Sequence, residues 1–269
     1  AIGAVAGAVA GAGAGAPRIF CGIYTLQSAH TKNALATRNT WAKRCDGFLA
    51  FSSITDEGFP SIDIPHEGKE EYDNMWQKSR SIWKYIHRHL KDDFDFFLMG
   101  GDDMFFLVEN LRAYLGSDEI QNKKKEGKGL FIGRVFKPPK QVVFNSGGAG
   151  YILDRAALEI LGKSLDSPKC YPHQHGFWED VNVASCLGKH DVFPYDSRDS
   201  LGRERFHPFL PSLQLAYRIP KKPDWYAKYN PDLKVGFECC SEQSVSFHYA
   251  KESTLYGLYN YVYHCANKG

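Results

Sequence analysis

The sequence lacks an excess of charge of either sign. Its 33 lysines and arginines almost balance its 31 aspartates and glutamates, and the formal net charge is +2 at pH 7. The basic residues are spread along the chain, apart from the run Lys123-Lys124-Lys125, which we expect to lie in a solvated loop. Nucleic-acid-binding domains usually concentrate basic residues on one face. The composition therefore predicts that nucleic acid is not a partner.

A run of apolar residues long enough to cross a membrane is also missing. Residues 1–16 consist almost entirely of alanine, glycine and valine, but the segment is too short and too rich in glycine to span a bilayer. We expect it to be a low-complexity segment that is not part of the fold. Residues 17–269 then form a single domain, because 43% of the chain is hydrophobic and no Pro/Ser-rich linker divides it. Any membrane anchor is expected outside the given residues.

Cysteine spacings typical of a zinc site are absent. The chain has seven cysteines, but no Cys-x-x-Cys pair occurs with a second such pair or with closely spaced histidines. Cys239 and Cys240 are adjacent, which suits neither tetrahedral metal binding nor the redox motifs of cytosolic proteins. We interpret the set as disulfides with one odd thiol, which indicates a secretory compartment. The alternative is seven buried, reduced cysteines.

Short apolar runs and apolar stripes at helical spacing alternate along the chain. The predicted strands are 18–25, 46–52, 94–99 and 129–135, and the predicted helices are 31–44, 72–90, 108–114 and 155–162. This alternation is typical of an α/β fold with a mostly parallel central sheet flanked by helices. In such sheets, ligands bind beyond the carboxyl ends of the strands.

Two carboxylates follow the predicted strand 94–99. Gly100 and Gly101 precede Asp102 and Asp103, and these glycines would let a phosphate approach closely. Carboxylate oxygens suit Mg²⁺ or Mn²⁺, and such ions bridge diphosphates. The pair is therefore a candidate metal and nucleotide site, and the alternative is a helix N-cap or a turn.

Three further segments could carry chemistry. The segment 145–151 has glycines that allow close approach of a ligand, with a tight turn as the alternative. Glu179 and Asp180 enter a predicted helix, where an acid could act as a general base or only complement the helix dipole. His248 lies between aromatic residues, either as a core residue or as an imidazole ligand that favours Mn²⁺.

Together and in this order, these segments resemble glycosyltransferase family 31, and most closely its core 1 β1,3-galactosyltransferases (T-synthases). The resemblance covers nearly all of the chain from Arg18 to Tyr263. Its most specific stretches are Thr40-Trp-Ala-Lys-Arg-Cys45, Asn145-Ser-Gly-Gly-Ala-Gly-Tyr151, Glu179-Asp-Val181, Asp196-Ser-Arg-Asp199, Phe206-His-Pro-Phe209, Cys239-Cys-Ser241 and Val245-Ser-Phe-His-Tyr249.

The resemblance implies a GT-A glycosyltransferase fold over residues 17–269. It implies the lumenal catalytic domain of a type II Golgi membrane protein, and it leaves a homodimer open. The implied reaction is inverting, depends on Mn²⁺, and moves galactose from UDP-galactose to an O-linked GalNAc on serine or threonine. The partner would be a GalNAc-bearing glycoprotein or glycopeptide, and the product a core 1 O-glycan.

The resemblance also implies a role for individual residues. Asp103 and His248 match the metal ligands, and Asp180 matches the catalytic base. The implied donor-binding residues are Asp102, Arg38, Trp41, Gly147 and Gly148, and the implied acceptor-binding residues are Trp225 and Glu179.

The chain also departs from the family pattern. Gly101 replaces the first acid of a triplet that usually reads Asp-Asp-Asp, the acceptor segment Asp224–Tyr229 has fewer tryptophans, and Cys265 is additional. One alternative is a catalytically impaired T-synthase-like chaperone. Another is a related β1,3-glycosyltransferase with a different donor and acceptor. A pure binding module such as a lectin fits less well, because it would not need a base beside a metal site.

Overall fold

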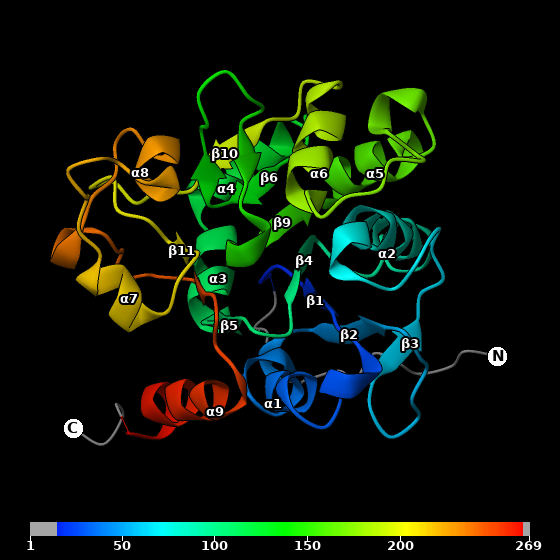
Figure 1. Cartoon of the computed structure of the whole chain (residues 1–269). Helices are drawn as coiled ribbons and strands as arrows, with labels where there is room; N and C mark the ends of the chain where they lie inside the picture. The colour runs from blue at the N-terminus through cyan, green and yellow to red at the C-terminus, as the bar shows by residue number, and fades with distance from the viewer. Residues whose placement is uncertain (1–14, 266–269) are drawn as a thin grey trace.

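A seven-stranded sheet with the order β10-β6-β9-β4-β1-β2-β3 forms the centre of the fold (Figure 1). The computed structural model describes residues 15–265, so most of the expected low-complexity segment lies outside the described residues. Only the pairs of β9 with β4 and with β6 are antiparallel, which confirms a mostly parallel α/β sheet. The strands are Ile19–Tyr24 (β1), Gly47–Ser52 (β2), Ser61–Asp63 (β3), Phe96–Gly101 (β4), Phe131–Gly133 (β6), Tyr151–Asp154 (β9) and Pro194–Asp196 (β10).

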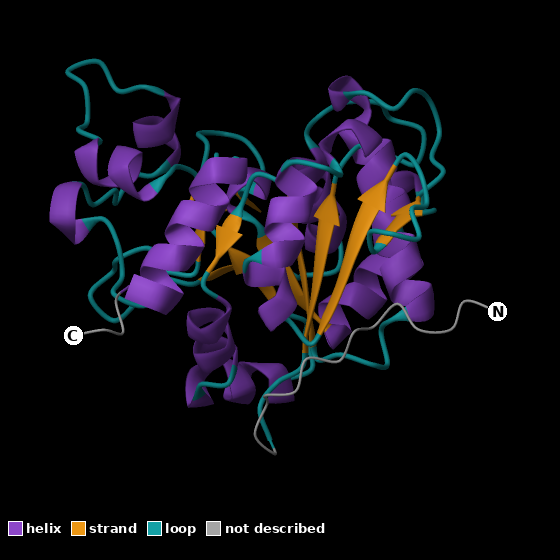
Figure 2. Cartoon of the chain, turned by 90° about the horizontal axis from the view of Figure 1, so that it is seen from below, coloured by secondary structure: helices purple, strands orange, loops and turns teal. Residues whose placement is uncertain are grey.

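Helices cover both faces of this sheet, and Figure 2 shows the strands running between them. Two smaller sheets, β11-β12-β5 and β7-β8, lie beside it within the described residues. Their strands are Phe105–Phe106 (β5), Val135–Phe136 (β7), Phe144–Asn145 (β8), Phe206–His207 (β11) and Ser246–Phe247 (β12). The helices are Asn33–Asn39 (α1), Met75–His89 (α2), Val108–Leu115 (α3), Asp118–Lys125 (α4), Arg155–Ser164 (α5), Glu179–Gly188 (α6), Pro211–Ala216 (α7), Trp225–Tyr229 (α8) and Glu252–Asn260 (α9).

The alternation of side chains along each strand divides the core in two. Ile19, Cys21 and Ile23 of β1 pack in one buried cluster with residues of α1, α3 and α9. Phe20 belongs to a second cluster with residues of α2, α5 and α6, and Tyr24 packs partly against it. Because both faces are buried, the central strands are continuous apolar runs, which is why sequence patterns detect them.

Several predicted elements differ in detail. The helix expected at 31–44 ends at Asn39 and continues after Thr40 as a 3₁₀ turn. The lysine run is not a loop but the last turn of α4, where Lys124 pairs with Asp95 at 2.8 Å. Cations at a helix C-terminus complement its dipole, and a charge count alone does not reveal this. Tyr72, expected in the buried stripe of α2, precedes that helix and is 73% exposed.

Three disulfides confirm the interpretation of the cysteines. They join Cys21 with Cys45, Cys170 with Cys186, and the neighbours Cys239 and Cys240, while Cys265 is a free, exposed thiol. The first ties β1 to the 3₁₀ turn after α1, and the second ties the segment before α6 to that helix. Between residues 15 and 265, none of the helices has both the length and the apolar character needed to cross a membrane.

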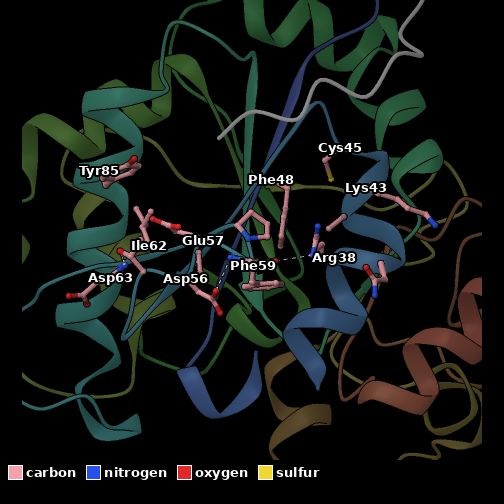
Figure 3. A pocket seen from close by; sticks show the side chains of 16 residues that line it. Arg38, Lys43, Cys45, Phe48, Asp56, Glu57, Phe59, Ile62, Asp63 and Tyr85 are labelled. Atoms are coloured by element: carbon pink, nitrogen blue, oxygen red, sulfur yellow. Dashed lines mark hydrogen bonds between the residues drawn. The ribbon is translucent and has the colours of Figure 1, made fainter. Parts of the chain in front are cut away.

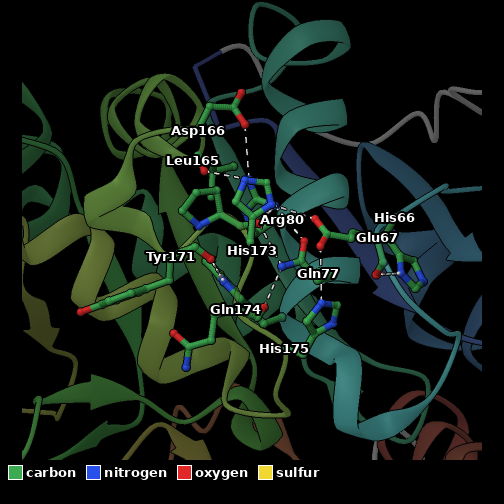
Figure 4. A network of polar contacts seen from close by, with 12 residues as sticks. His66, Glu67, Gln77, Arg80, Leu165, Asp166, Tyr171, His173, Gln174 and His175 are labelled. Atoms are coloured by element: carbon green, nitrogen blue, oxygen red, sulfur yellow. Dashed lines mark hydrogen bonds and ion pairs between the residues drawn. The ribbon is translucent and has the colours of Figure 1, made fainter.

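A buried polar network fastens the loop before α6 to α2 (Figure 4). The Arg80 guanidinium donates to the carbonyl oxygens of Pro172 at 2.6 Å and Leu165 at 2.9 Å. The Gln77 amide donates to Pro172 and Gln174, at 3.0 and 2.7 Å. Glu179 and Asp180 begin the helix that follows, so this network anchors the segment that leads to both acids.

We predict that Arg80→Ala lowers the free energy of unfolding by about 2–4 kcal/mol, because it removes the donor of the buried Leu165 carbonyl oxygen and of Gln77 Oε1. Urea denaturation followed by circular dichroism measures this loss. The matched control is Lys84→Ala, which removes a partly exposed partner of Asp166 and should cost at most about 1 kcal/mol. Equal losses for the two variants would contradict a structural role for the Arg80 network.

Candidate active site

Two adjoining cavities open beyond the carboxyl ends of β1 and β4. The larger has a volume of about 590 Å³ and the smaller about 350 Å³. Tyr24, Tyr72, Met75 and Asp103 line both, so the cavities form one continuous cleft. This is the edge of an α/β sheet at which ligands generally bind.

The two aspartates that follow β4 face different groups. Asp102 lines the smaller cavity and accepts a hydrogen bond from the Thr25 hydroxyl at 2.5 Å. Burial raises the pKa of Asp102, and the Thr25 hydroxyl counteracts part of that effect. Asp103 lines both cavities and is only partly exposed. The neighbouring acids therefore have separate surroundings, and only Asp103 is directed toward the second half of the chain.

Asp103 and His248 meet in the larger cavity although they are far apart in the sequence. Asp103 Oδ1 lies 3.4 Å from His248 Nε2. The backbone N–H of Ala250 donates to the Asp103 carbonyl oxygen at 2.7 Å and so fixes the two segments together. Ligand atoms about 2.1 Å from one ion and at right angles to each other lie about 3 Å apart. The oxygen and nitrogen are thus spaced to share a divalent ion.

The other coordination positions are not supplied by a dense ligand cluster. Among residues 15–265, no group of three or more histidine, cysteine or acidic side chains is arranged to hold a metal. Gly148 lies directly behind the imidazole, and a Cβ atom at this position would be 2.7 Å from His248 Nδ1. Because Gly148 has no side chain, the His248 imidazole has room to face Asp103.

Asp180 lies in the same cavity, at the first turn of α6. Its carboxylate accepts hydrogen bonds from the backbone N–H groups of Gly147 and Val181, both at 2.8 Å. A Cβ atom on Gly147 would be 2.4 Å from Glu179 Oε1 and 3.3 Å from the side chain of Asp180. Glycine is thus required at residue 147 so that both acids can approach the backbone.

The adjacent acids differ in their electrostatic environment. Burial, followed by the negative charge of Asp180, raises the pKa of Glu179 to about 8, and its Oε2 accepts a hydrogen bond from Tyr151 at 2.9 Å. Burial also raises the pKa of Asp180, but the N–H groups of Gly147 and Val181 favour its charged form. Near neutral pH, Glu179 is therefore the acid that keeps its proton, and Asp180 is the better candidate base.

Aromatic side chains form much of the cavity wall, and sequence patterns did not single out most of them. Trp225 at the start of α8 is 49% exposed and lies against Phe136 and Phe209. Tyr72 and Phe177 stack with ring centres 5.7 Å apart, although Tyr72 was expected in the core. Tyr24 was missed because its place at the end of an apolar strand gives no signal of a ligand site.

Two of the expected donor-binding residues lie away from the cleft. Trp41 is fully buried against Phe106, and its indole N–H donates to the Met104 carbonyl oxygen at 2.7 Å. Trp41 therefore has no free surface for a donor in this conformation and instead supports the residue after Asp103. Arg38 is exposed and lines a separate cavity of about 1040 Å³ between α1 and the segment 55–63 (Figure 3). That cavity is larger than either cavity of the cleft, but its lining includes neither Asp103, Asp180 nor His248.

Comparison with known proteins relates this cleft to glycosyltransferases. No family model matches the chain. The chain is 32% identical over 255 residues to glycoprotein-N-acetylgalactosamine 3-beta-galactosyltransferase 1 of Xenopus laevis, covering 94% of this chain and 68% of that protein.

Two further matches have lower identity and cover less of this chain. Human chondroitin sulfate synthase 3 is 28% identical over 187 residues, and human chondroitin sulfate glucuronyltransferase is 25% identical over 153 residues. These matches cover 63% and 55% of this chain but only 20% and 19% of the relatives. The near-complete match to the Xenopus protein, on an α/β fold with this cleft, shows that the chain belongs to glycosyltransferase family 31, as a homologue of the core 1 β1,3-galactosyltransferases.

Proposed function

We propose that this glycosyltransferase is an inverting, Mn²⁺-dependent β1,3-galactosyltransferase that uses UDP-galactose as donor. Its acceptor would be an O-linked GalNAc on a glycoprotein or glycopeptide. The observation that carries the proposal is the meeting of Asp103, His248 and Asp180 in one cavity of about 590 Å³. The match to the Xenopus galactosyltransferase over 94% of the chain supports the choice of substrates.

Asp103 and His248 are the residues that would hold the metal. When bound, Mn²⁺ neutralises the charge of the diphosphate and of the leaving group. Imidazole nitrogen beside carboxylate oxygen is a donor set that favours Mn²⁺ over Mg²⁺. With only two protein ligands at 3.4 Å from each other, coordination positions stay open for phosphate oxygens and water.

Asp180 would accept the proton of the acceptor 3-hydroxyl. The hydroxyl oxygen then bonds to the anomeric carbon as the bond from that carbon to the diphosphate oxygen breaks, and the α-linked donor gives a β-linked product. One base is sufficient, because no covalent intermediate forms on the protein. The N–H groups of Gly147 and Val181 hold the carboxylate in place, and burial raises its basicity.

The acidic lining of the larger cavity supports the proposal that the transferred sugar is uncharged. The described residues that line the larger cavity include Asp103, Glu179 and Asp180 but no lysine or arginine. A glucuronate donor would bring a further carboxylate next to these acids without a cation to pair with it. This favours galactose over the donor implied by the name of the glucuronyltransferase relative.

Trp225 and Glu179 are the proposed acceptor contacts. The exposed indole of Trp225 offers an apolar face to a sugar ring, and a protonated Glu179 can donate a hydrogen bond to a sugar oxygen. The three disulfides support an oxidising compartment, and we place the domain in the Golgi lumen as part of this proposal.

We predict that Asp180→Asn lowers galactose transfer at least about 100-fold, since it removes the general base. UDP affinity in the presence of Mn²⁺, measured by calorimetry, should stay nearly unchanged, because Asp180 does not hold the diphosphate. Transfer is measured as UDP release from UDP-galactose with a GalNAc-peptide.

Asp92→Asn is the control for that experiment, since its carboxylate is 81% exposed outside the cleft, and it should keep wild-type turnover. Wild-type turnover by Asp180→Asn would show that the base is wrongly assigned. If the wild-type protein releases UDP only from another donor, such as UDP-GlcNAc, the proposed substrates are wrong.

We predict that His248→Ala and Asp103→Asn both abolish the enhancement of UDP binding by Mn²⁺, because each removes one of two protein ligands. Calorimetric titration of UDP with and without Mn²⁺ measures this, and Asp180→Asn should retain the enhancement. An unchanged Mn²⁺ titration curve for His248→Ala would remove that residue from the metal site.

We predict that the stability of Glu179→Gln relative to wild type increases with pH. The folded-state pKa of about 8 lies above the ordinary value of 4.5, so the unfolded chain loses this proton first and wild-type stability falls as the pH rises between these values. The relative gain should reach a few kcal/mol, because a pKa difference of one between the folded and unfolded states corresponds to about 1.4 kcal/mol. Urea midpoints at pH 5 and pH 9 test it, and a constant difference between the variants would contradict a neutral buried Glu179.

A further inference from the structure

Tyr24 occupies a particular position between the two cavities of the cleft. It is the last residue of β1, and its side chain lines both cavities. In the parallel pairing of β1 with β4, Tyr24 is the register partner of Gly101. Gly101 directly precedes Asp102 and Asp103, so the aromatic ring lies beside the start of the acidic segment.

A side chain on residue 101 would be in tight contact with the ring of Tyr24. A Cβ atom there would lie 3.3 and 3.6 Å from the Tyr24 ring atoms Cε2 and Cζ, and 3.0 Å from Asp103 Oδ1. The backbone of Gly101 does not have the positive φ that restricts residues other than glycine. Close contacts with these side chains, and not the backbone conformation, would therefore restrict an acid at this position.

The Tyr24 hydroxyl is a donor without a protein partner. It makes no hydrogen bond to any group within residues 15–265, although Glu179, Asp103 and Asp180 all act on it electrostatically. Burial, followed by these negative charges, raises the pKa of Tyr24 well above its usual value, so the hydroxyl keeps its proton. Lys78, which lines the smaller cavity, already donates to the Thr25 carbonyl at 2.6 Å and to Glu70 at 2.9 Å.

We propose that the Tyr24 hydroxyl donates a hydrogen bond to a phosphate oxygen of the nucleotide-sugar donor, where the two cavities join. The proposal rests on the proposed function, because it assumes that Asp103 and His248 direct the diphosphate to this place. A diphosphate presents only acceptor oxygens, and a protonated phenol is a neutral donor for them. Tyr24 with Gly101 thus provides a donor contact in place of one more carboxylate, which would repel the phosphates.

Tyr24→Phe is the direct test, because it removes the hydroxyl and keeps the ring. The affinity for UDP in the presence of Mn²⁺, measured by calorimetry, should fall about tenfold, as expected for one hydrogen bond to a charged group. The thermal midpoint should not change, since the hydroxyl bonds to no protein group. Tyr114→Phe is the matched control: its hydroxyl likewise has no hydrogen-bond partner among the described residues, but it lies in α3 outside the cleft, and UDP affinity should be unaffected.

A second set of variants tests whether the Tyr24 ring and a side chain at residue 101 compete for the same space. Gly101→Asp should weaken UDP binding, because the new side chain meets both the Tyr24 ring and Asp103. Adding Tyr24→Ala to Gly101→Asp should recover part of the affinity, whereas Tyr24→Ala alone should lower it. A double variant that binds no better than Gly101→Asp alone would contradict this account of the pair.

The outcomes separate this proposal from the function on which it rests. Wild-type UDP affinity in Tyr24→Phe, in a wild-type protein that binds UDP with Mn²⁺ and transfers galactose, would overturn the role of Tyr24 alone. Failure of the wild-type protein to bind UDP would overturn both. Reduced UDP affinity in Tyr24→Phe with unchanged affinity in Tyr114→Phe supports the proposed contact.

Discussion

The approach of Asp103 to His248 is the constraint on which the rest of the cleft depends. The first residue follows a central strand of the large sheet, and the second follows a short strand of another sheet, so their meeting requires both sheets to be complete. The hydrogen bond from Ala250 to the Asp103 carbonyl locks the two segments at the backbone level, independently of any ion. The fold thus brings the two side chains to 3.4 Å from each other.

Three glycines make this arrangement of the cleft possible, because a Cβ atom at each of them would crowd a side chain of the site. Gly148 gives room to His248, Gly147 lets Glu179 and Asp180 reach the backbone, and Gly101 gives room to Tyr24 and Asp103. The cleft is thus shaped as much by missing Cβ atoms as by the functional groups themselves. The glycine-rich segment 145–151 has no phosphate-binding pattern, but it is still part of the site. Its glycines leave room for side chains of the protein itself.

The sheet and the positions of the main acids beside it can be predicted from the sequence, but most of the residues around these acids cannot. Strands such as β1 and β4 are buried on both faces, so their apolar runs are visible without a structure. The resemblance led to Asp103, Asp180 and His248, which the fold brings into one cavity. It also suggested Trp41 and Arg38 as donor contacts, which lie in the core and in another cavity. Tertiary packing decides such placements, and a motif that is close in sequence to a site does not reveal which of its side chains face it.

The adjacent acids Glu179 and Asp180 show why a single base can function in this acidic cavity. Two neighbouring carboxylates cannot both ionise easily in a buried site, and the charge of Asp180 raises the pKa of Glu179. The backbone N–H groups of Gly147 and Val181 stabilise the charge on Asp180, whereas Glu179 has a single phenolic donor, Tyr151. Asp180 is therefore the ionised acid of the pair. Glu179 keeps its proton and can serve as a hydrogen-bond donor. The asymmetry comes from two backbone donors, so the roles of the two acids follow from where α6 begins and from the position of Gly147 beside it.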